Sequence, residues 1–147
     1  MEKAFVVSDI HGCYEPFVKL LEYWDKSIKL VILGDLIDRG EASKQVVQEV
    51  MKLKETYQDQ VVVLKGNHED MFLKFLQDPV RMGDIYFFNG GRMTVKDFID
   101  ESFILHRGLQ ELADLVRERA SKEVNFIRNL PLYEEFGKVL FVHAGIK

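Results

Sequence analysis

Short apolar runs recur along the chain, and polar or charged residues follow each of them directly. The runs cover residues 4–7, 30–33, 61–64 and 139–142. Uninterrupted apolar runs of this length, bounded by turn signals, are typical of buried strands. Apolar residues at helical spacing separate the first three runs. Because helices that join successive strands accompany parallel pairing, the pattern predicts an α/β fold with a mostly parallel central sheet.

The first half of the chain predicts three helices. The first is expected to begin at Glu15–Pro16, because proline is tolerated in the first turn of a helix. Ser43 is expected to cap the second helix, and the third is expected to stop before Pro79. The residues expected to face the core are Phe17, Leu20, Leu21 and Trp24 in the first helix, Val46, Val47, Val50, Met51 and Tyr57 in the second, and Met71, Phe72 and Phe75 in the third.

The second half of the chain is expected to be mainly helical until its last strands. Asn89-Gly90-Gly91 is a strong turn signal. Apolar stripes predict a short helix, a longer helix and further helical packing up to Pro131. Residues 132–136 and 139–142 flank Gly137–Lys138 and predict a β-hairpin. The stripes consist of Val95, Phe98 and Ile99, then Leu105, Leu109, Leu112 and Val116, then Phe126, Ile127 and Leu130.

Composition narrows the class of protein. Residues 1–147 fit a single domain that can bury a real core. A chain that is 47% hydrophobic and 30% charged is globular rather than disordered. The net charge of −4 provides no basic field for nucleic acid or an anionic membrane. A lone cysteine, Cys13, and the lack of a signal-peptide layout or a membrane-length apolar stretch predict a soluble cytoplasmic protein.

Each of the four apolar runs ends in side chains that commonly bind metals. If the strands lie parallel in one sheet, their carboxyl ends meet at one edge, where ligands bind in such sheets. Carboxylates, an amide oxygen and imidazoles without sulfur suit Mn, Fe, Zn or Ni. The set is large for one ion, and two ions sharing an aspartate would form the usual clamp for displacement at phosphorus. The residues are Asp9, His11, Asp35, Asp38, Asn67, His68 and His143.

Local roles are alternatives for several residues near these runs. Asp35 and Asp38 could be acidic residues at a helix N-terminus, and Asn67 could be a turn residue. Glu69 is interpreted as a helix-start carboxylate without a catalytic role. The aromatic residues Phe72, Phe75, Phe87 and Phe88 are interpreted as core rather than as a platform for substrate.

The motifs that follow the runs resemble those of the calcineurin-like metallophosphoesterases. Ser8-Asp9-Ile10-His11-Gly12 resembles the family's Asp-x-His-Gly motif, and residues 34–40 resemble Gly-Asp-x-x-Asp-Arg-Gly. Residues 66–69 and 142–145 are similar to the Gly-Asn-His-Glu and His-Ala-Gly motifs. The motifs stand in family order from residue 8 to 145. Their form is similar to that of bacterial phosphoprotein phosphatases, which include serine/threonine phosphatases and symmetrical dinucleoside tetraphosphate hydrolases.

The resemblance implies a layered α/β sandwich that holds two divalent metal ions, with Mn expected first and Fe, Zn or Ni as alternatives. It implies that Asp9 and His11 hold the first metal. Asn67 and His143 would hold the second metal, and Asp35 would bridge both.

The resemblance also implies catalytic and substrate-binding roles. Arg39 would bind phosphate oxygens, which its planar guanidinium group suits. His68 would be the general acid that protonates the leaving alkoxide, and Asp38 would hold its tautomer and orientation. A hydroxide activated by both metals would be the nucleophile. These roles predict a metal-dependent phosphatase, specifically a serine/threonine protein phosphatase acting on phosphoproteins, with symmetrical dinucleoside tetraphosphate hydrolysis as the alternative.

The family's pattern continues beyond His-Ala-Gly to a Gly-His segment whose histidine completes the second metal site. This chain stops at Lys147, so it is expected to represent the N-terminal part of the usual family domain or a natural short form. A short form that binds metal or phosphate without turnover is therefore a further alternative. An incomplete second sheet would expose apolar faces and favour homo-oligomers.

Overall fold

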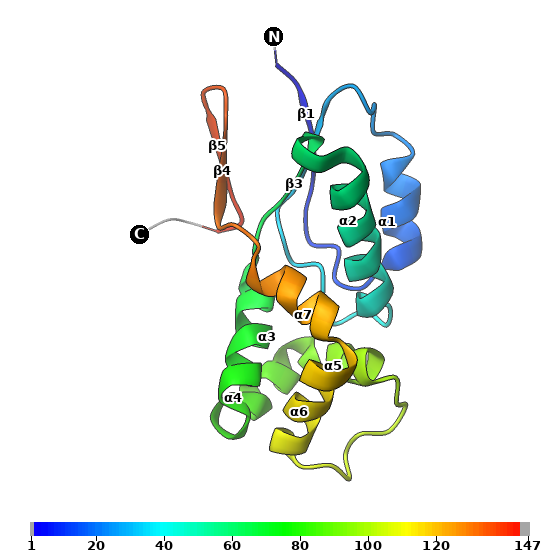
Figure 1. Cartoon of the computed structure of the whole chain (residues 1–147), viewed down its shortest axis with the longest axis vertical. Coiled ribbons are helices and arrows are strands. Elements are labelled where there is room, and N and C mark those ends of the chain that lie inside the picture. Colours follow the sequence, from blue (N-terminus) through cyan, green and yellow to red (C-terminus); the bar gives the residue numbers. More distant parts are fainter. Residues whose placement is uncertain (1, 145–147) are drawn as a thin grey trace.

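The computed structural model describes residues 2–144, and its elements follow the predicted alternation of strands and helices (Figure 1). The strands are β1 (Ala4–Val7), β2 (Lys29–Ile32), β3 (Val61–Val63), β4 (Tyr133–Phe136) and β5 (Val139–Val142). The helices are α1 (Tyr14–Leu21), α2 (Ser43–Tyr57), α3 (Asn67–Gln77), α4 (Pro79–Tyr86), α5 (Arg92–Ile99), α6 (Leu109–Arg119) and α7 (Ser121–Arg128). Two short helical segments complete them, η1 (Gln58–Gln60) and η2 (Phe87–Gly91).

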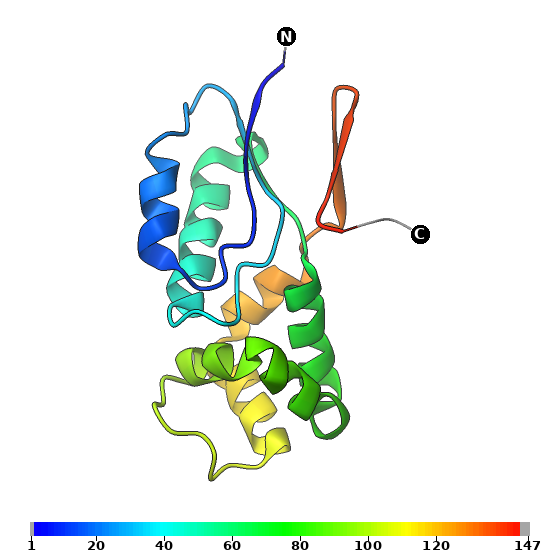
Figure 2. The same ribbon diagram turned by 180° about the vertical axis from the view of Figure 1, so that it is seen from behind.

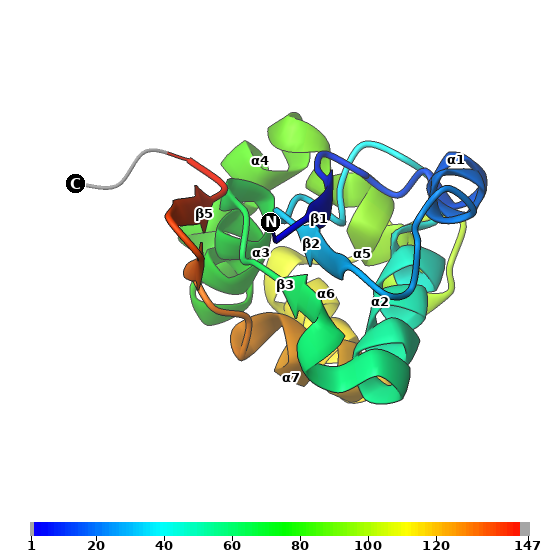
Figure 3. The same ribbon diagram turned by 90° about the horizontal axis from the view of Figure 1, so that it is seen from above.

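Strands β1, β2 and β3 form the predicted parallel sheet, with β2 in the middle. The register pairs Val7 with Ile32 and Ile32 with Val63, so the three strands end side by side. Helices α1 and α2 lie on one side of this sheet (Figure 3). Because the strands end together, the loops that carry Asp9 and Asp35 and the start of α3 at Asn67 lie at the same edge.

The predicted hairpin is present, but it is separate from the parallel sheet. Strands β4 and β5 pair only with each other among the described residues, so the condition that all four apolar runs lie parallel in one sheet is not met. The hairpin stands on the side of the sheet away from α1 and α2 (Figures 2 and 3). Phe141 packs there against Val31, Val62 and Leu64. The exposed large apolar residues on and near the hairpin are Leu132, Tyr133, Val139 and Leu140.

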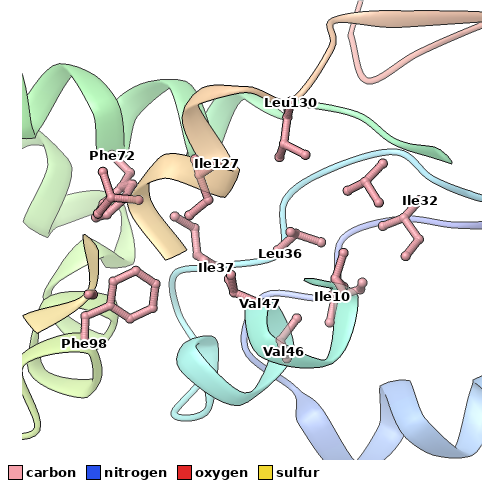
Figure 4. Close-up of a cluster of buried hydrophobic side chains, with 14 of the residues drawn as sticks. Ile10, Ile32, Leu36, Ile37, Val46, Val47, Phe72, Phe98, Ile127 and Leu130 are labelled. Carbon is pink, nitrogen blue, oxygen red and sulfur yellow. The ribbon is translucent and has the colours of Figure 1, made fainter. Parts of the chain in front are cut away.

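Helices α3 to α7 form a second part of the molecule beyond the carboxyl ends of the strands (Figure 1). One hydrophobic core joins this part to the sheet and its helices. Leu36 and Ile37 lie at the junction, with Val46 and Val47 on one side and Phe72 and Phe98 on the other (Figure 4). No helix of residues 2–144 has the length and apolar character that a membrane crossing needs.

Three sequence predictions need correction in detail. Leu20 and Leu105 are 41% and 61% exposed, because Leu20 lies off the buried face of α1 and Leu105 precedes α6. Ser43 is the first residue of α2 rather than its cap, and its hydroxyl accepts the Asp38 N–H over 3.2 Å. Asn89-Gly90-Gly91 lies between α4 and α5, as its turn signal predicted, because Gly90 has a φ of 98° and breaks the helical backbone there.

Shortening Phe98 to alanine should destabilise the fold. Phe98 is fully buried and packs edge-to-face on Phe72, with ring centroids 5.6 Å apart. We expect Phe98→Ala to lower the free energy of unfolding by about 3–5 kcal/mol in urea denaturation, because it leaves a cavity. Phe103→Ala, at a residue that is 57% exposed, is the control and should cost less than about 0.5 kcal/mol. Equal losses in the two variants would contradict the proposed core.

Candidate active site

The loops after β1 and β2 touch each other through their backbones. The His11 N–H donates to the Asp35 carbonyl over 2.9 Å, and the Gly40 N–H donates to the His11 carbonyl over 3.0 Å. A Cβ atom on Gly40 would lie 2.2 Å from that His11 oxygen, so no larger residue fits. Left-handed non-glycine residues concentrate at functional sites, where surrounding contacts hold them. Here they are Asp9, His11, Asp35, Asp38 and Arg39, with φ between 45° and 75°.

Asp35 lies at the centre of the predicted site and is only 4% exposed. Its Oδ2 atom is 3.6 Å from Nε2 of His11 and 3.1 Å from Nε2 of His143. Its Oδ1 atom accepts the backbone N–H of His68 over 3.1 Å. One carboxylate therefore faces side chains that arrive from β1 and β5 and the backbone at the start of α3.

Backbone carbonyl groups hold His11 and His143 in the same tautomer. Nδ1 of His11 donates to the carbonyl of Ile37, and Nδ1 of His143 donates to that of Leu33, both over 2.8 Å. The tautomer follows from these partners, because a carbonyl oxygen can only accept. In this tautomer of the neutral imidazole, each Nε2 carries the lone pair and lies on the side of Asp35. Metal-binding histidines show this arrangement, with the other ring nitrogen donating to a fixed acceptor.

Asn67 and Asp9 complete the surroundings of Asp35. The side-chain amide of Asn67 lies 2.8 Å from Nε2 of His143, and its nitrogen can donate to both oxygens of Asp35 over 3.2 Å. Asp9 is exposed, and its Oδ1 atom lies 4.0 Å from Nε2 of His11. The predicted ligand residues are thus brought together at one place, although β5 is outside the parallel sheet.

Two groups of ligand atoms in this cluster could hold metal ions. The first comprises His11, Asp35 and His68, and the second comprises Asp9, Asp35 and His143; the atoms of each group lie within 4.8 Å of one another. Imidazole nitrogen and carboxylate oxygen suit divalent transition metals. Because Asp35 belongs to both groups, the donor set fits two ions with a shared carboxylate. Which residue binds which ion stays a prediction.

Asp38 and His68 form a buried pair beside this cluster. Nδ1 of His68 lies 2.8 Å from Oδ2 of Asp38, and the two residues are 3% and 0% exposed. The hydrogen bond to Asp38 raises the pKa of His68, and burial opposes that rise. The rings of His11 and His68 meet edge-to-face, with centroids 4.6 Å apart. The pair can therefore hold a proton on His68 next to the candidate metal ligands.

The sequence patterns did not identify two residues that contact Asp38. The hydroxyl groups of Tyr86 and Thr94 each lie 2.6 Å from Oδ1 of Asp38. Tyr86 looks like an ordinary core position of α4, and Thr94 has no distinctive neighbours. In the sequence, only the turn signal at residues 89–91 distinguishes the segment between Tyr86 and Thr94.

Glu69 is a helix-start residue, as predicted, and it also supports Asp35. Its carboxylate is fully buried and accepts the N–H groups of Asp35, Leu36 and Gly66, at 2.6, 3.0 and 2.9 Å. Burial raises the pKa of Glu69 to about 7, and these backbone donors oppose the rise. The carboxylate thereby joins the loop after β2 to the start of α3.

Arg39 is exposed at the rim of the cluster. Its backbone N–H donates to the Gly90 carbonyl over 3.0 Å. Within residues 2–144, its guanidinium group takes part in no hydrogen bond or ion pair, so it does not pair with Asp38.

The aromatic residues of the neighbouring helices differ in burial. Phe72 and Phe75 lie in the core, as predicted, whereas Phe88, which was also predicted to be core, is 90% exposed.

A family model described as calcineurin-like phosphoesterase matches residues 3–146. The chain belongs to this family. Members of the family use divalent metal ions, which agrees with the His and Asp groups around Asp35. The predicted family is therefore confirmed.

Curated relatives extend the comparison. The chain is 30% identical over 161 residues to the asymmetrical bis(5'-nucleosyl)-tetraphosphatase PrpE of Geobacillus sp. (strain WCH70), covering 99% of this chain and 58% of that protein. It is 46% identical over 69 residues to the symmetrical bis(5'-nucleosyl)-tetraphosphatase of Buchnera aphidicola subsp. Acyrthosiphon pisum (strain Tuc7), covering 45% and 24%. The chain thus spans little more than half the length of the relatives that it matches throughout.

Solved structures share the fold. A cold-active protein-tyrosine phosphatase of a psychrophilic Shewanella species superposes with a TM-score of 0.62 at 22% identity, over 100% of this chain and 43% of that one. A serine/threonine phosphatase from Saccharomyces cerevisiae superposes with a TM-score of 0.55 at 21% identity, over 90% and 34%. These likenesses confirm the predicted α/β metallophosphoesterase fold.

Replacing Glu69 by glutamine should weaken the junction between the loop after β2 and α3. Glutamine has one acceptor oxygen, so its NH2 group would face at least one of the three backbone donors. We expect Glu69→Gln to lower the free energy of unfolding by about 1–3 kcal/mol, measured in urea. The matched control is Glu118→Gln on the exposed side of α6, which should change it by less than about 0.5 kcal/mol. An unchanged Glu69→Gln protein would show that the three contacts are unimportant.

Proposed function

We propose that this chain carries the metal-dependent site of a phosphoesterase whose substrate is a dinucleoside tetraphosphate. The observation that carries the catalytic part of this proposal is the buried Asp38–His68 pair beside the Asp35-centred cluster. The substrate rests on the curated relatives, which are bis(5'-nucleosyl)-tetraphosphatases of both the asymmetrical and the symmetrical kind.

The side chains around Asp35 would hold the metal ions. Asp9, His11, Asn67 and His143 would be the other ligands, and Mn is the first candidate among the divalent metals that suit carboxylate and imidazole ligands. Bound divalent ions would supply positive charge for the phosphoryl oxygens and would activate water as the nucleophile. The carbonyl groups of Ile37 and Leu33 hold Nδ1 of His11 and His143, which leaves each Nε2 on the side of Asp35 for a metal ion.

The remaining side chains would bind phosphate and deliver a proton. Arg39 has an exposed guanidinium group at the rim, which can bind two phosphate oxygens at once. His68 receives a fixed orientation from Asp38 through Nδ1, so Nε2 is the atom that can donate a proton to the leaving group. The pKa rise caused by Asp38 keeps His68 protonated at higher pH than an ordinary histidine.

A serine/threonine phosphatase is the second candidate, and the Asp38–His68 pair favours it. The alkoxide that leaves from phosphoserine is a much stronger base than the phosphate that leaves from a tetraphosphate. A fixed proton donor such as His68 therefore helps the first reaction more.

Direct assays separate the two candidates. With Mn added, we expect nucleotides to be released from diadenosine tetraphosphate, as measured by chromatography. The rate should be at least about tenfold higher than the rate of phosphate release from a phosphoserine peptide at equal concentration. Exclusive release of phosphate from the peptide would favour the second candidate. Bound metal without cleavage of either compound would favour the alternative of a binding protein without turnover.

Substitution of the two buried aspartates should separate metal binding from proton delivery. We expect Asp35→Asn to lose bound Mn, measured by elemental analysis after dialysis, because a shared ligand is weakened. Asp38→Asn should keep its Mn and lose about a hundredfold in kcat, because its partner is His68. Equal metal loss in both variants would make Asp38 a metal ligand instead.

A further inference from the structure

The Asp38 carboxylate is fully buried, and each of its oxygens has its own partners. Oδ2 accepts from Nδ1 of His68 over 2.8 Å. Oδ1 accepts from the hydroxyl groups of Tyr86 and Thr94, each over 2.6 Å. The four residues are at most 3% exposed. Burying a carboxylate is costly unless donors compensate it, so these contacts are required for the folded loop.

The number of protons that each group can donate determines which partner donates in each hydrogen bond. An ionised carboxylate can only accept, so Tyr86 and Thr94 both donate to it. Thr94 has a single hydroxyl proton, so its oxygen accepts from the Asp38 N–H at 2.8 Å and from the Ser43 hydroxyl at 3.2 Å. Ser43 in turn accepts the Asp38 N–H at 3.2 Å. Burial and the Asp38 charge raise the pKa of Tyr86, so its hydroxyl keeps the proton that it donates.

The segment from Tyr86 to Thr94 is shaped to bring both hydroxyl groups to one carboxylate oxygen. Gly90 has a φ of 98° and separates α4 from α5. A Cβ atom on Gly91 would lie 2.4 Å from the Tyr86 ring, so glycine makes room for that ring. The Gly90 carbonyl accepts the Arg39 N–H over 3.0 Å. The segment therefore contacts the two consecutive left-handed residues, Asp38 and Arg39, by side chains and by backbone.

We propose that Tyr86 and Thr94 are positioning residues for proton delivery, which fix Oδ1 of Asp38 so that Oδ2 stays on Nδ1 of His68. The proposal rests on the proposed function, in which His68 is the proton donor. Without the two hydroxyl groups, the carboxylate can rotate about its Cβ–Cγ bond and lose its alignment with the imidazole. Helices α4 and α5 would thereby orient the Asp38–His68 pair through these two hydroxyl groups.

Proton NMR tests the positioning itself, without turnover. The Nδ1–H of a histidine bonded to a carboxylate gives a strongly downfield resonance, which His68→Asn assigns by removing it. We expect Tyr86→Phe and Thr94→Val to shift or broaden this resonance, and Thr94→Ser to retain it, because serine keeps the hydroxyl. Tyr57→Phe, which removes a tyrosine hydroxyl from α2, is the matched control and should leave it unchanged. An unchanged resonance in both Tyr86→Phe and Thr94→Val would overturn the proposal.

Kinetics with two aryl phosphates test whether this positioning affects proton delivery by His68. Phenyl phosphate has a poor leaving group and needs the proton donor, whereas p-nitrophenyl phosphate has a good one. We expect Tyr86→Phe to lower kcat about tenfold for phenyl phosphate and less than about twofold for p-nitrophenyl phosphate, with KM unchanged. In the His68→Asn background, Tyr86→Phe should have no further effect on kcat.

The outcomes distinguish failure of the positioning role from failure of the proposed function. Equal losses on both substrates, or full additivity with His68→Asn, would mean that Tyr86 supports only the fold and would overturn the positioning role. An enzyme that cleaves the aryl phosphates but not diadenosine tetraphosphate would overturn the proposed substrate and leave the positioning result standing. Absence of all turnover would overturn the proposed function, and the NMR comparison would still decide whether the hydroxyl groups position Asp38.

Discussion

The close approach of the loop backbones at the carboxyl ends of β1, β2 and β3 is the constraint on which the rest of the structure depends. A Cβ atom on Gly40 would lie 2.2 Å from the His11 oxygen, and one on Gly34 would lie 2.4 Å from the Gly66 nitrogen. The two glycines therefore allow three loops to touch where side chains would otherwise keep them apart. This contact places side chains from three strand ends around the carboxylate of Asp35.

The contact requires an unfavourable backbone, and the surrounding hydrogen bonds offset it. Left-handed conformations of non-glycine residues cost about 1–3 kcal/mol each. Glu69 stabilises the loop after β2 by accepting two of its N–H groups, and the Gly90 carbonyl and the Ser43 and Thr94 hydroxyl groups accept others. These contacts consequently hold the backbone of the loop after β2 in one arrangement.

The helical part of the molecule supports the site as well as the core. Tyr86 and Thr94 reach from α4 and α5 to Asp38, and α3 begins with Asn67 and His68. The same helices supply Phe72 and Phe98 to the core beneath the loops (Figure 4). The helices that pack into the core therefore also orient the Asp38–His68 pair.

The sequence by itself determined the parallel strands, most of the helices, the family and the set of candidate ligands. These features are local, because they depend on apolar periodicity and on which residues follow each strand. The tertiary structure alone decided that β4 and β5 stand apart from the parallel sheet, that Ser43 faces Asp38 rather than capping α2, and that Glu69 holds the Asp35 loop. It also decided the contacts of Tyr86 and Thr94 with Asp38, which join residues 48 and 56 positions apart. Such contacts follow from how helices pack over the loops, and no local pattern of residue types encodes that packing.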